Sequence, residues 1–313
     1  MSVFVDVSYS AYHQMVIDAL GMVISNMNTA LVFALSLISR SFPYLSLVVP
    51  PFIRTMENRQ CDQRHITRIL YFLMDLVQTV KEHIRTYLPG ILKAVEPFWE
   101  TNQFEILRFV RTCSACFYSE FKLYLVYVLP RMLSLLAEDP PEKKAATTEI
   151  VHCLHCIVPS LDNHLNVVLP VLIRFIENNQ EYSANQREAV KCLRRIVHEL
   201  DVSLYTSQII MPLLRVLSRD YCDVIPEIMD VICAVISQKQ QEAYIYLTAI
   251  NKVVAEKKII YPKFTEISNA LYRGGVLPAM EYVFDKEDDS INLQEELLQP
   301  RPYRGDTCRN YGS

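Results

Sequence analysis

Glycine is scarce in this sequence. Only 6 of the 313 residues are glycine, which is far below the ~7% of an average protein. The shortage disfavours folds that depend on Gly-rich phosphate loops or tight hairpins, and it excludes a collagen repeat. Prolines number 16 and hydrophobic residues make up 51% of the chain. This combination predicts a mostly helical protein whose helices are punctuated by proline, with enough apolar surface to exclude wholesale disorder.

An excess of charge of one sign is also missing. The formal net charge is −4, so no overall basic field attracts nucleic acid or acidic lipid. The short basic clusters, such as Lys143–Lys144 and Arg194–Arg195, are isolated and have acidic neighbours. We therefore expect no nucleic-acid binding.

One uncharged run has the length of a membrane span. No Asp, Glu, Lys or Arg occurs from Ala19 to Ser39, and about 20 apolar residues can cross a bilayer. Asn26 and Asn28, however, lie near the middle of the run. Two buried helices that meet at a loop explain the run better than a transmembrane helix, so we expect no integral membrane segment.

A proline marks an internal repeat. Each copy places the proline within an apolar run, as in TYLPGILKAV and VVLPVLIRFI. The five prolines stand at intervals of 39, 41, 40 and 42 residues: Pro50, Pro89, Pro130, Pro170 and Pro212. A sixth copy has Ala249 in place of proline. A period near 40 with two helices per unit is typical of HEAT and armadillo repeats.

The segment before each proline carries a helical stripe. Apolar side chains recur at offsets 0, 3, 4, 7, 8 and 11, which places them on one helix face. The three clearest stripes are Val110, Cys113, Ser114, Phe117, Tyr118, Phe121; Ile150, Cys153, Leu154, Ile157, Val158, Leu161; and Ala189, Cys192, Leu193, Ile196, Val197, Leu200. A further copy around Ile228–Ile236 slips by one residue.

These units predict an all-α fold. A single helix pair cannot bury its stripe, so neighbouring pairs must stack into a solenoid. We predict a HEAT-type helical-repeat solenoid, an α-α superhelix of about six to seven helix pairs, over residues 1–285. Residues 286–313 are acidic and polar without a sustained apolar face, and we interpret them as a tail or linker.

The nine cysteines do not suggest a disulfide framework, because the chain is long and the number is odd. Two CxxC pairs, Cys113–Cys116 and Cys153–Cys156, resemble zinc-binding motifs. The repeat offers a simpler explanation, since Cys113, Cys153 and Cys192 occupy one column of the stripe, where a small apolar side chain packs between units. We therefore predict core cysteines, no metal site and no cofactor.

Motifs of known catalytic sites are absent from the sequence. It contains no GxGxxG, Walker, HRD, DFG, HExxH or GxSxG motif. His155 falls on the polar side of its stripe and His198 falls near a helix end, so we expect both side chains to be solvated. We predict that this chain has no catalytic site.

A basic residue recurs at one phase of the repeat. It follows the proline, or its replacement, by three or four residues in five of the six copies: Arg54, Lys93, Arg174, Arg215 and Lys252. Ser134 takes this place in the remaining copy. The column is interpreted either as a solvated or ion-paired row or as an edge that docks a protein partner.

The amino-acid sequences of the repeats resemble those of one protein family. EFKLYLVYVLPRMLSLLAEDPP (Glu120–Pro141), LDNHLNVVLPVLIRFIE (Leu161–Glu177) and RIVHELDVSLYTSQIIMPLLRVL (Arg195–Leu217) are similar to the middle HEAT repeats of the TOR (target of rapamycin) protein kinases. The resemblance extends from about His13 to Asp289. The stretch Asn28–Tyr44 departs from it, being longer and more apolar than the family's connection there.

The resemblance implies a scaffold. TOR proteins are large serine/threonine kinases of growth and nutrient signalling, and their kinase and rapamycin-binding domains have no counterpart here. In the family the middle repeats take part in dimer formation and in docking a Raptor-type subunit. The implied function is assembly of a TOR-type complex in the cytoplasm, on endomembranes or in the nucleus. Two alternatives stay open, namely a part of a complete TOR kinase and a general HEAT-repeat adaptor.

Overall fold

A computed structural model describes residues 45–57, 63–138, 144–179, 183–219 and 222–274. All regular secondary structure in these ranges is helical, and no strand occurs in them. The predicted all-α fold is confirmed. The uncharged run Ala19–Ser39, the departing stretch Asn28–Tyr44 and the predicted tail 286–313 lie outside the described residues.

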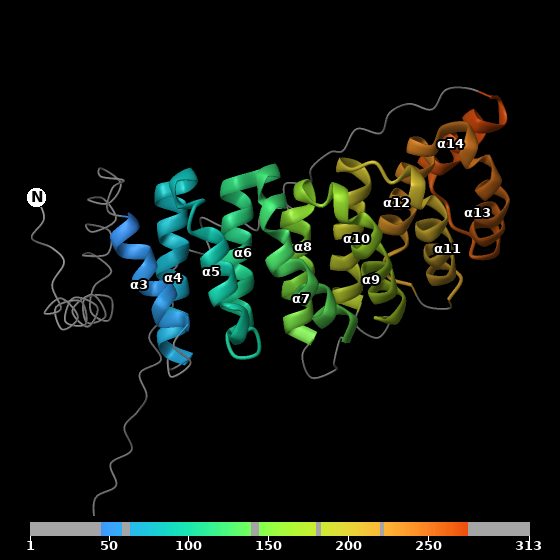
Figure 1. Cartoon of the computed structure of the whole chain (residues 1–313). Coiled ribbons are helices and arrows are strands. Elements are labelled where there is room, and N and C mark those ends of the chain that lie inside the picture. The colour runs from blue at the N-terminus through green and yellow to red at the C-terminus, as the bar shows by residue number, and fades with distance from the viewer. Residues whose placement is uncertain (1–44, 58–62, 139–143, 180–182, 220–221, 275–313) are drawn as a thin grey trace, which may run out of the picture. The chain divides into compact units, whose positions relative to one another are not determined.

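The helices alternate between two layers (Figure 1). The first layer, called here the even layer, consists of α4 (Gln63–Val80), α6 (Gln103–Phe117), α8 (Lys144–Ile157), α10 (Ser183–Glu199), α12 (Ile225–Lys239) and α14 (Pro262–Tyr272). The second, called the odd layer, consists of α3 (Leu45–Glu57), α5 (Leu88–Ala94), α7 (Leu125–Glu138), α9 (Leu165–Asn178), α11 (Thr206–Leu217) and α13 (Tyr244–Glu256). Each helix packs against the next one of its own layer. Contacts between every second helix are the pattern of a helical-repeat arrangement.

Most of the repeated prolines lie inside their helices. Pro130, Pro170 and Pro212 are interior residues of α7, α9 and α11, and only Pro89 stands at a helix start, that of α5. An interior proline removes the hydrogen bond to the carbonyl four residues earlier. For the three interior prolines of α7, α9 and α11, that carbonyl belongs to an exposed residue: Val126, Asn166 and Gln208. Water at these exposed residues can replace the missing donor, which lowers the cost of the proline.

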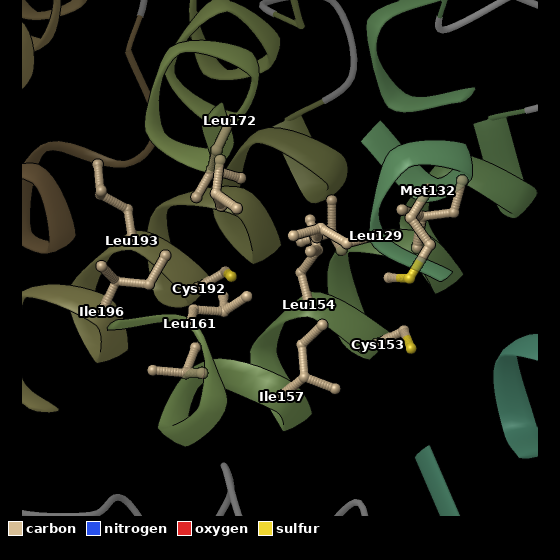
Figure 2. Packing of buried hydrophobic residues seen from close by; sticks show 14 of the residues in the cluster. Leu129, Met132, Cys153, Leu154, Ile157, Leu161, Leu172, Cys192, Leu193 and Ile196 are labelled. Atoms are coloured by element: carbon tan, nitrogen blue, oxygen red, sulfur yellow. The ribbon is translucent and has the colours of Figure 1, made fainter. Parts of the chain in front are cut away.

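The predicted stripes form the core between the layers. Leu154, Ile157 and Leu161 are fully buried, and their counterparts Leu193 and Ile196 are buried as well. Figure 2 shows these side chains together with Leu129 and Met132 of α7 and Leu172 of α9. Burying one such side chain contributes about 1.5–3 kcal/mol. The stripe prediction is confirmed for most positions, and the exceptions are Leu200, which is only partly buried, and Tyr118, which is exposed.

Two parts of the stripe pattern differ from the prediction. Tyr118 was expected on the buried face, but it is 72% exposed. The reason is local, because α6 ends at Phe117 and Tyr118 takes a φ of 46°, which turns the chain out of the helix. In α12 every residue from Ile228 to Ser237 is buried. This helix is covered by α10, α11 and α14, so its sequence does not show a single stripe and the repeat pattern slips.

Candidate interaction surface

The five residues of the predicted basic row lie on one layer. Arg54, Lys93, Arg174, Arg215 and Lys252 belong to α3, α5, α9, α11 and α13, the odd layer. All five are exposed. A docking edge must be exposed and lie on one layer, and the row meets both conditions. A solvated row would meet them too, so both interpretations of the row agree with its placement.

Ion pairing differs along the row. Arg215 Nε lies 2.8 Å from Glu177 Oε1 of the neighbouring helix α9, and Lys252 Nζ lies 3.9 Å from Glu256 Oε1 of its own helix. The side chains of Arg54, Lys93 and Arg174 have no hydrogen bond or ion pair with the described residues. Exposed pairs of this kind contribute about 0–1 kcal/mol. Most of the charge on the row is therefore available to solvent or to a partner.

Exposed apolar residues accompany the basic row. Pro170 precedes Arg174 by four residues, and Met211 precedes Arg215 by four, so each pair shares a helix face. Similar side chains are exposed elsewhere on the layer: Val126 and Tyr127 on α7, Val167 on α9, and Tyr244 and Ile245 on α13. Sequence reasoning missed them because it searched for the buried stripe. Apolar residues that fall off the stripe offsets were the signal that could have revealed them.

The row is interrupted at α7. Ser134 stands there in place of a basic residue, and it lines a groove of ≈ 500 Å³ between α7 and the segment after α5. Its hydroxyl donates to Glu138 Oε1 at 3.2 Å. The odd layer therefore offers a row of cations with one polar gap.

The even layer carries ion pairs that join neighbouring repeats. Arg111 of α6 donates to Glu149 of α8 at 2.7 Å. His152 of α8 lies between Glu149, at 3.8 Å, and Glu188 of α10, at 3.3 Å. These two carboxylates raise the pKa of His152 to about 9, and His152 in turn lowers the pKa of Glu188 to about 2. His152 is therefore a cation at neutral pH that joins α8 to α10.

A second cluster joins α10, α12 and α14. Asp230 of α12 is 2.6 Å from Arg194 Nε, 2.9 Å from Lys263 Nζ and 3.8 Å from His198 Nε2. Although burial opposes ionisation, the polar contact with His198, the hydrogen bond from Lys263 and the Arg194 charge hold the pKa of Asp230 well below its usual range. The carboxylate is thus a fixed anion that ties the last described helix to the array.

The expectation that His155 and His198 are solvated is wrong. His155 is 8% exposed, and the side chain of His198 is 4% exposed. The flank of α8 that seemed polar is covered by α10, whose Arg195 donates to the His155 carbonyl at 3.1 Å. Burial and the Arg195 charge lower the pKa of His155 to about 4, so it is neutral. A single-helix pattern cannot show that both flanks of a helix are covered.

The predicted core cysteines are confirmed. Cys113, Cys153 and Cys192 are fully buried, and burial raises the pKa of each thiol. Thiols with raised pKa values are poor nucleophiles. Within the described ranges, no group of three or more His, Cys, Asp or Glu side chains is placed to hold a metal ion.

In the described ranges, no single helix has the length and apolar character needed to cross a membrane. One bent pair, Lys144–Ser160 with Asp162–Asn178, passes a test of length and composition, with an angle of 116° between its halves.

No family model matches the chain. Three curated relatives share its sequence over most of its length. The serine/threonine-protein kinase tor1 of Schizosaccharomyces pombe is 26% identical over 306 residues, which is 95% of this chain and 12% of the relative. The serine/threonine-protein kinase TOR of Oryza sativa subsp. japonica is 26% identical over 290 residues, 87% of this chain and 11% of the relative. TOR2 of Saccharomyces cerevisiae is 23% identical over 304 residues, with coverages of 95% and 12%.

The matches agree with the resemblance found in the repeats. They extend along nearly the whole chain, which spans only about one-eighth of the length of the relatives. The matched segment is all-α and packs as sequential helix pairs. This chain is a distant homologue of one segment of the TOR serine/threonine protein kinases.

Proposed function

We propose that this chain acts as a non-catalytic HEAT-type scaffold segment that mediates protein–protein assembly of a TOR-type complex. The observation that carries the proposal is the odd layer, where exposed cations and exposed apolar residues share helix faces on successive repeats. Helical-repeat proteins use such extended surfaces to bind other proteins. Homology to a segment of TOR kinases supports the choice of complex.

The proposed partners are a Raptor-type subunit, other components of the TOR complex, and a second copy of the chain. The proposed location is the cytoplasm, with recruitment to endomembranes or the nucleus through these partners. The growth and nutrient signalling of the TOR family is the proposed context. Nucleic acid and integral membranes are not among the proposed binding partners, given the net charge of −4.

The test is quantitative capture of partners by a tagged chain from its own cells. We compare the natural chain with the double variant Arg174→Glu/Arg215→Glu. Reversing both charges should reduce the recovery of Raptor-type and TOR kinase components, because like charges now face the acidic groups of the partner. The thermal unfolding midpoint should hardly change, since both side chains are exposed.

The matched control is Arg64→Glu/Arg68→Glu, which makes the same charge change on α4 of the even layer, where both residues are exposed. This control should leave capture unchanged. Equal capture by the natural chain and the Arg174/Arg215 variant would reduce the basic row to a solvated row. Failure of the natural chain to capture any TOR component would reject the proposed complex.

A second candidate is that the chain is part of a complete TOR serine/threonine kinase. The curated relatives carry that name, and they are about eight times longer than the matched segment. Transcript sequence that continues the reading frame into HRD- and DFG-like motifs would favour this candidate. A general HEAT-repeat adaptor is the third. It would be favoured if the captured proteins belonged to transport or phosphatase complexes instead.

A further inference from the structure

A groove interrupts the basic row of the odd layer. It lies between α7 and the 3₁₀ turn η3 (Glu96–Phe98) that follows α5. Helices α5 and α7 pack against each other in the odd layer. Its volume of ≈ 500 Å³ is within the range of sites that bind small molecules or a few side chains. Ser134 lines it at the position where the five other helices of the odd layer carry Lys or Arg.

The charge of the groove is opposite to that of the row. Glu96 and Glu100 line the side that follows α5, and Arg131 and Ser134 line the α7 side. Arg131 is the single cation of the lining, and it donates a hydrogen bond to Glu100. The carboxylate of Glu96 has no hydrogen bond or ion pair with any residue that the structure describes. One exposed carboxylate is therefore left over.

The remaining walls are apolar and aromatic. Val126, Tyr127 and Pro130 of α7 are exposed along one side of the groove. Trp99, which is buried, lines the groove from the segment after α5. An aromatic face beside a carboxylate matches the guanidinium of arginine, which stacks on rings and forms planar hydrogen bonds to carboxylates. Its aliphatic stem can lie along apolar side chains.

We propose that this groove binds an arginine side chain presented by an extended basic segment of a protein partner. The guanidinium pairs with Glu96 and stacks on Tyr127, and the stem rests on Val126 and Pro130. The inference goes beyond the docking edge of the basic row, because it assigns a second site of opposite charge preference at the one repeat that lacks the cation. A partner that binds both sites must present acidic and basic groups side by side.

Trp99 makes the test direct. It is the single tryptophan of the chain and it lines the groove, so the tryptophan fluorescence comes from one residue at the groove. The full chain is titrated with an acetylated nonapeptide that carries one central arginine between proline and alanine residues. Two matched peptides replace the arginine by norleucine or by glutamate. A saturable change in Trp99 emission is expected with the arginine peptide only.

Three variants locate the binding. Glu96→Gln should raise the Kd about two- to fivefold, the range for one exposed ion pair. Ser134→Lys restores the cation of the other repeats and should raise the Kd roughly tenfold or more through like-charge repulsion. Arg131→Ala removes the one cation of the lining and should lower the Kd. Glu256→Gln on α13, which is outside the groove, is the matched control and should leave the Kd unchanged.

Several results would overturn the assignment. One is an emission change of equal size with the norleucine peptide, which would reduce the groove to an apolar contact. Another is a Kd that neither Glu96→Gln nor Ser134→Lys alters while circular dichroism shows both variants folded. Preferential binding of the glutamate peptide would assign the groove to acidic partners through Arg131. Absence of any saturable change in the natural chain would also reject the proposal.

Discussion

The two layers of helices use charged residues in different ways. In the even layer, charged side chains from neighbouring helices meet one another, as in the pairs Arg111–Glu149 and Arg194–Asp230. In the odd layer, Arg174 and Lys93 face solvent. Charges in the even layer are thus used to hold repeats together, whereas most charges of the basic row in the odd layer remain available for binding. The comparison predicts that substitutions in the core and the even layer affect folding, while substitutions on the odd layer affect partners.

The largest effect is expected in the core that both layers share. Leu154→Ala removes a fully buried side chain and should lower the free energy of unfolding by about 2–5 kcal/mol. Urea denaturation followed by circular dichroism measures the change. Leu204→Ala, at a side chain that is 86% exposed, is the control and should have little effect. Equal effects of the two substitutions would mean that α8 does not form the core.

The next effect is expected at the Asp230 cluster of the even layer. Asp230→Ala leaves Arg194, His198 and Lys263 without their shared carboxylate. The loss of hydrogen bonds to a charged group should lower the free energy of unfolding by about 2–3 kcal/mol. Because α14 is joined to the array through this carboxylate, amide hydrogen exchange should increase first in α14. Glu266→Ala on the exposed face of α14 is the control, and similar exchange in both variants would contradict the assigned role.

The His152 pair gives the even layer a pH dependence. The pKa of His152 is raised to about 9 in the folded chain, above the usual 6.5 of the unfolded chain. Its contribution to stability is therefore fully present below pH 6.5 and is lost as the pH rises through 9. After allowance for partial exposure we expect a loss of about 1 kcal/mol between pH 6 and pH 10.

The measurement is the difference in unfolding free energy between the natural chain and His152→Gln at both pH values. The difference should be larger at pH 6 than at pH 10. His155 acts in the opposite sense, because its pKa is lowered to about 4 and its contribution is lost as the pH falls from 6.5 towards 4. Both proteins in the comparison keep His155, and both pH values lie above its folded-state pKa of about 4. A difference that is constant with pH would show that His152 is not charged in the folded chain.

The fold could be predicted from the sequence because every repeat has the same spacing of apolar residues and of prolines. The offsets of Leu154 and Leu193 within their stripes fix the buried face of two helices, and the spacing of the prolines fixes the unit length. The stripe is a property of one helix, however. The burial of His155 depends on Arg195 of the next helix, and the exposure of Tyr118 depends on a positive φ.

The candidate surface was predictable only in part. The basic row could be found because a basic residue recurs at the same position of the repeat. Its exposure could be predicted because that position lies outside the apolar stripe of the helix. The groove beside Ser134 could not be found, because it needs Glu96 and Tyr127 from two different helices to meet across a gap. No spacing within one helix encodes such a meeting.

The smallest effect on folding is expected on the odd layer, and it sharpens the comparison most. Arg174→Ala removes a side chain without an ion pair among the described residues, whereas Arg215→Ala removes one that pairs with Glu177 at 2.8 Å. Arg215 is 62% exposed at its side chain, so the pair contributes only about 0–1 kcal/mol. Arg174→Ala should therefore leave the free energy of unfolding unchanged, and Arg215→Ala should lower it by at most ~1 kcal/mol. Raising the salt concentration should remove the difference between the two variants, because salt screens exposed pairs. A loss above that limit in either variant would place its arginine in the framework of the repeats and would end the distinction between a layer that holds the array together and a layer that binds.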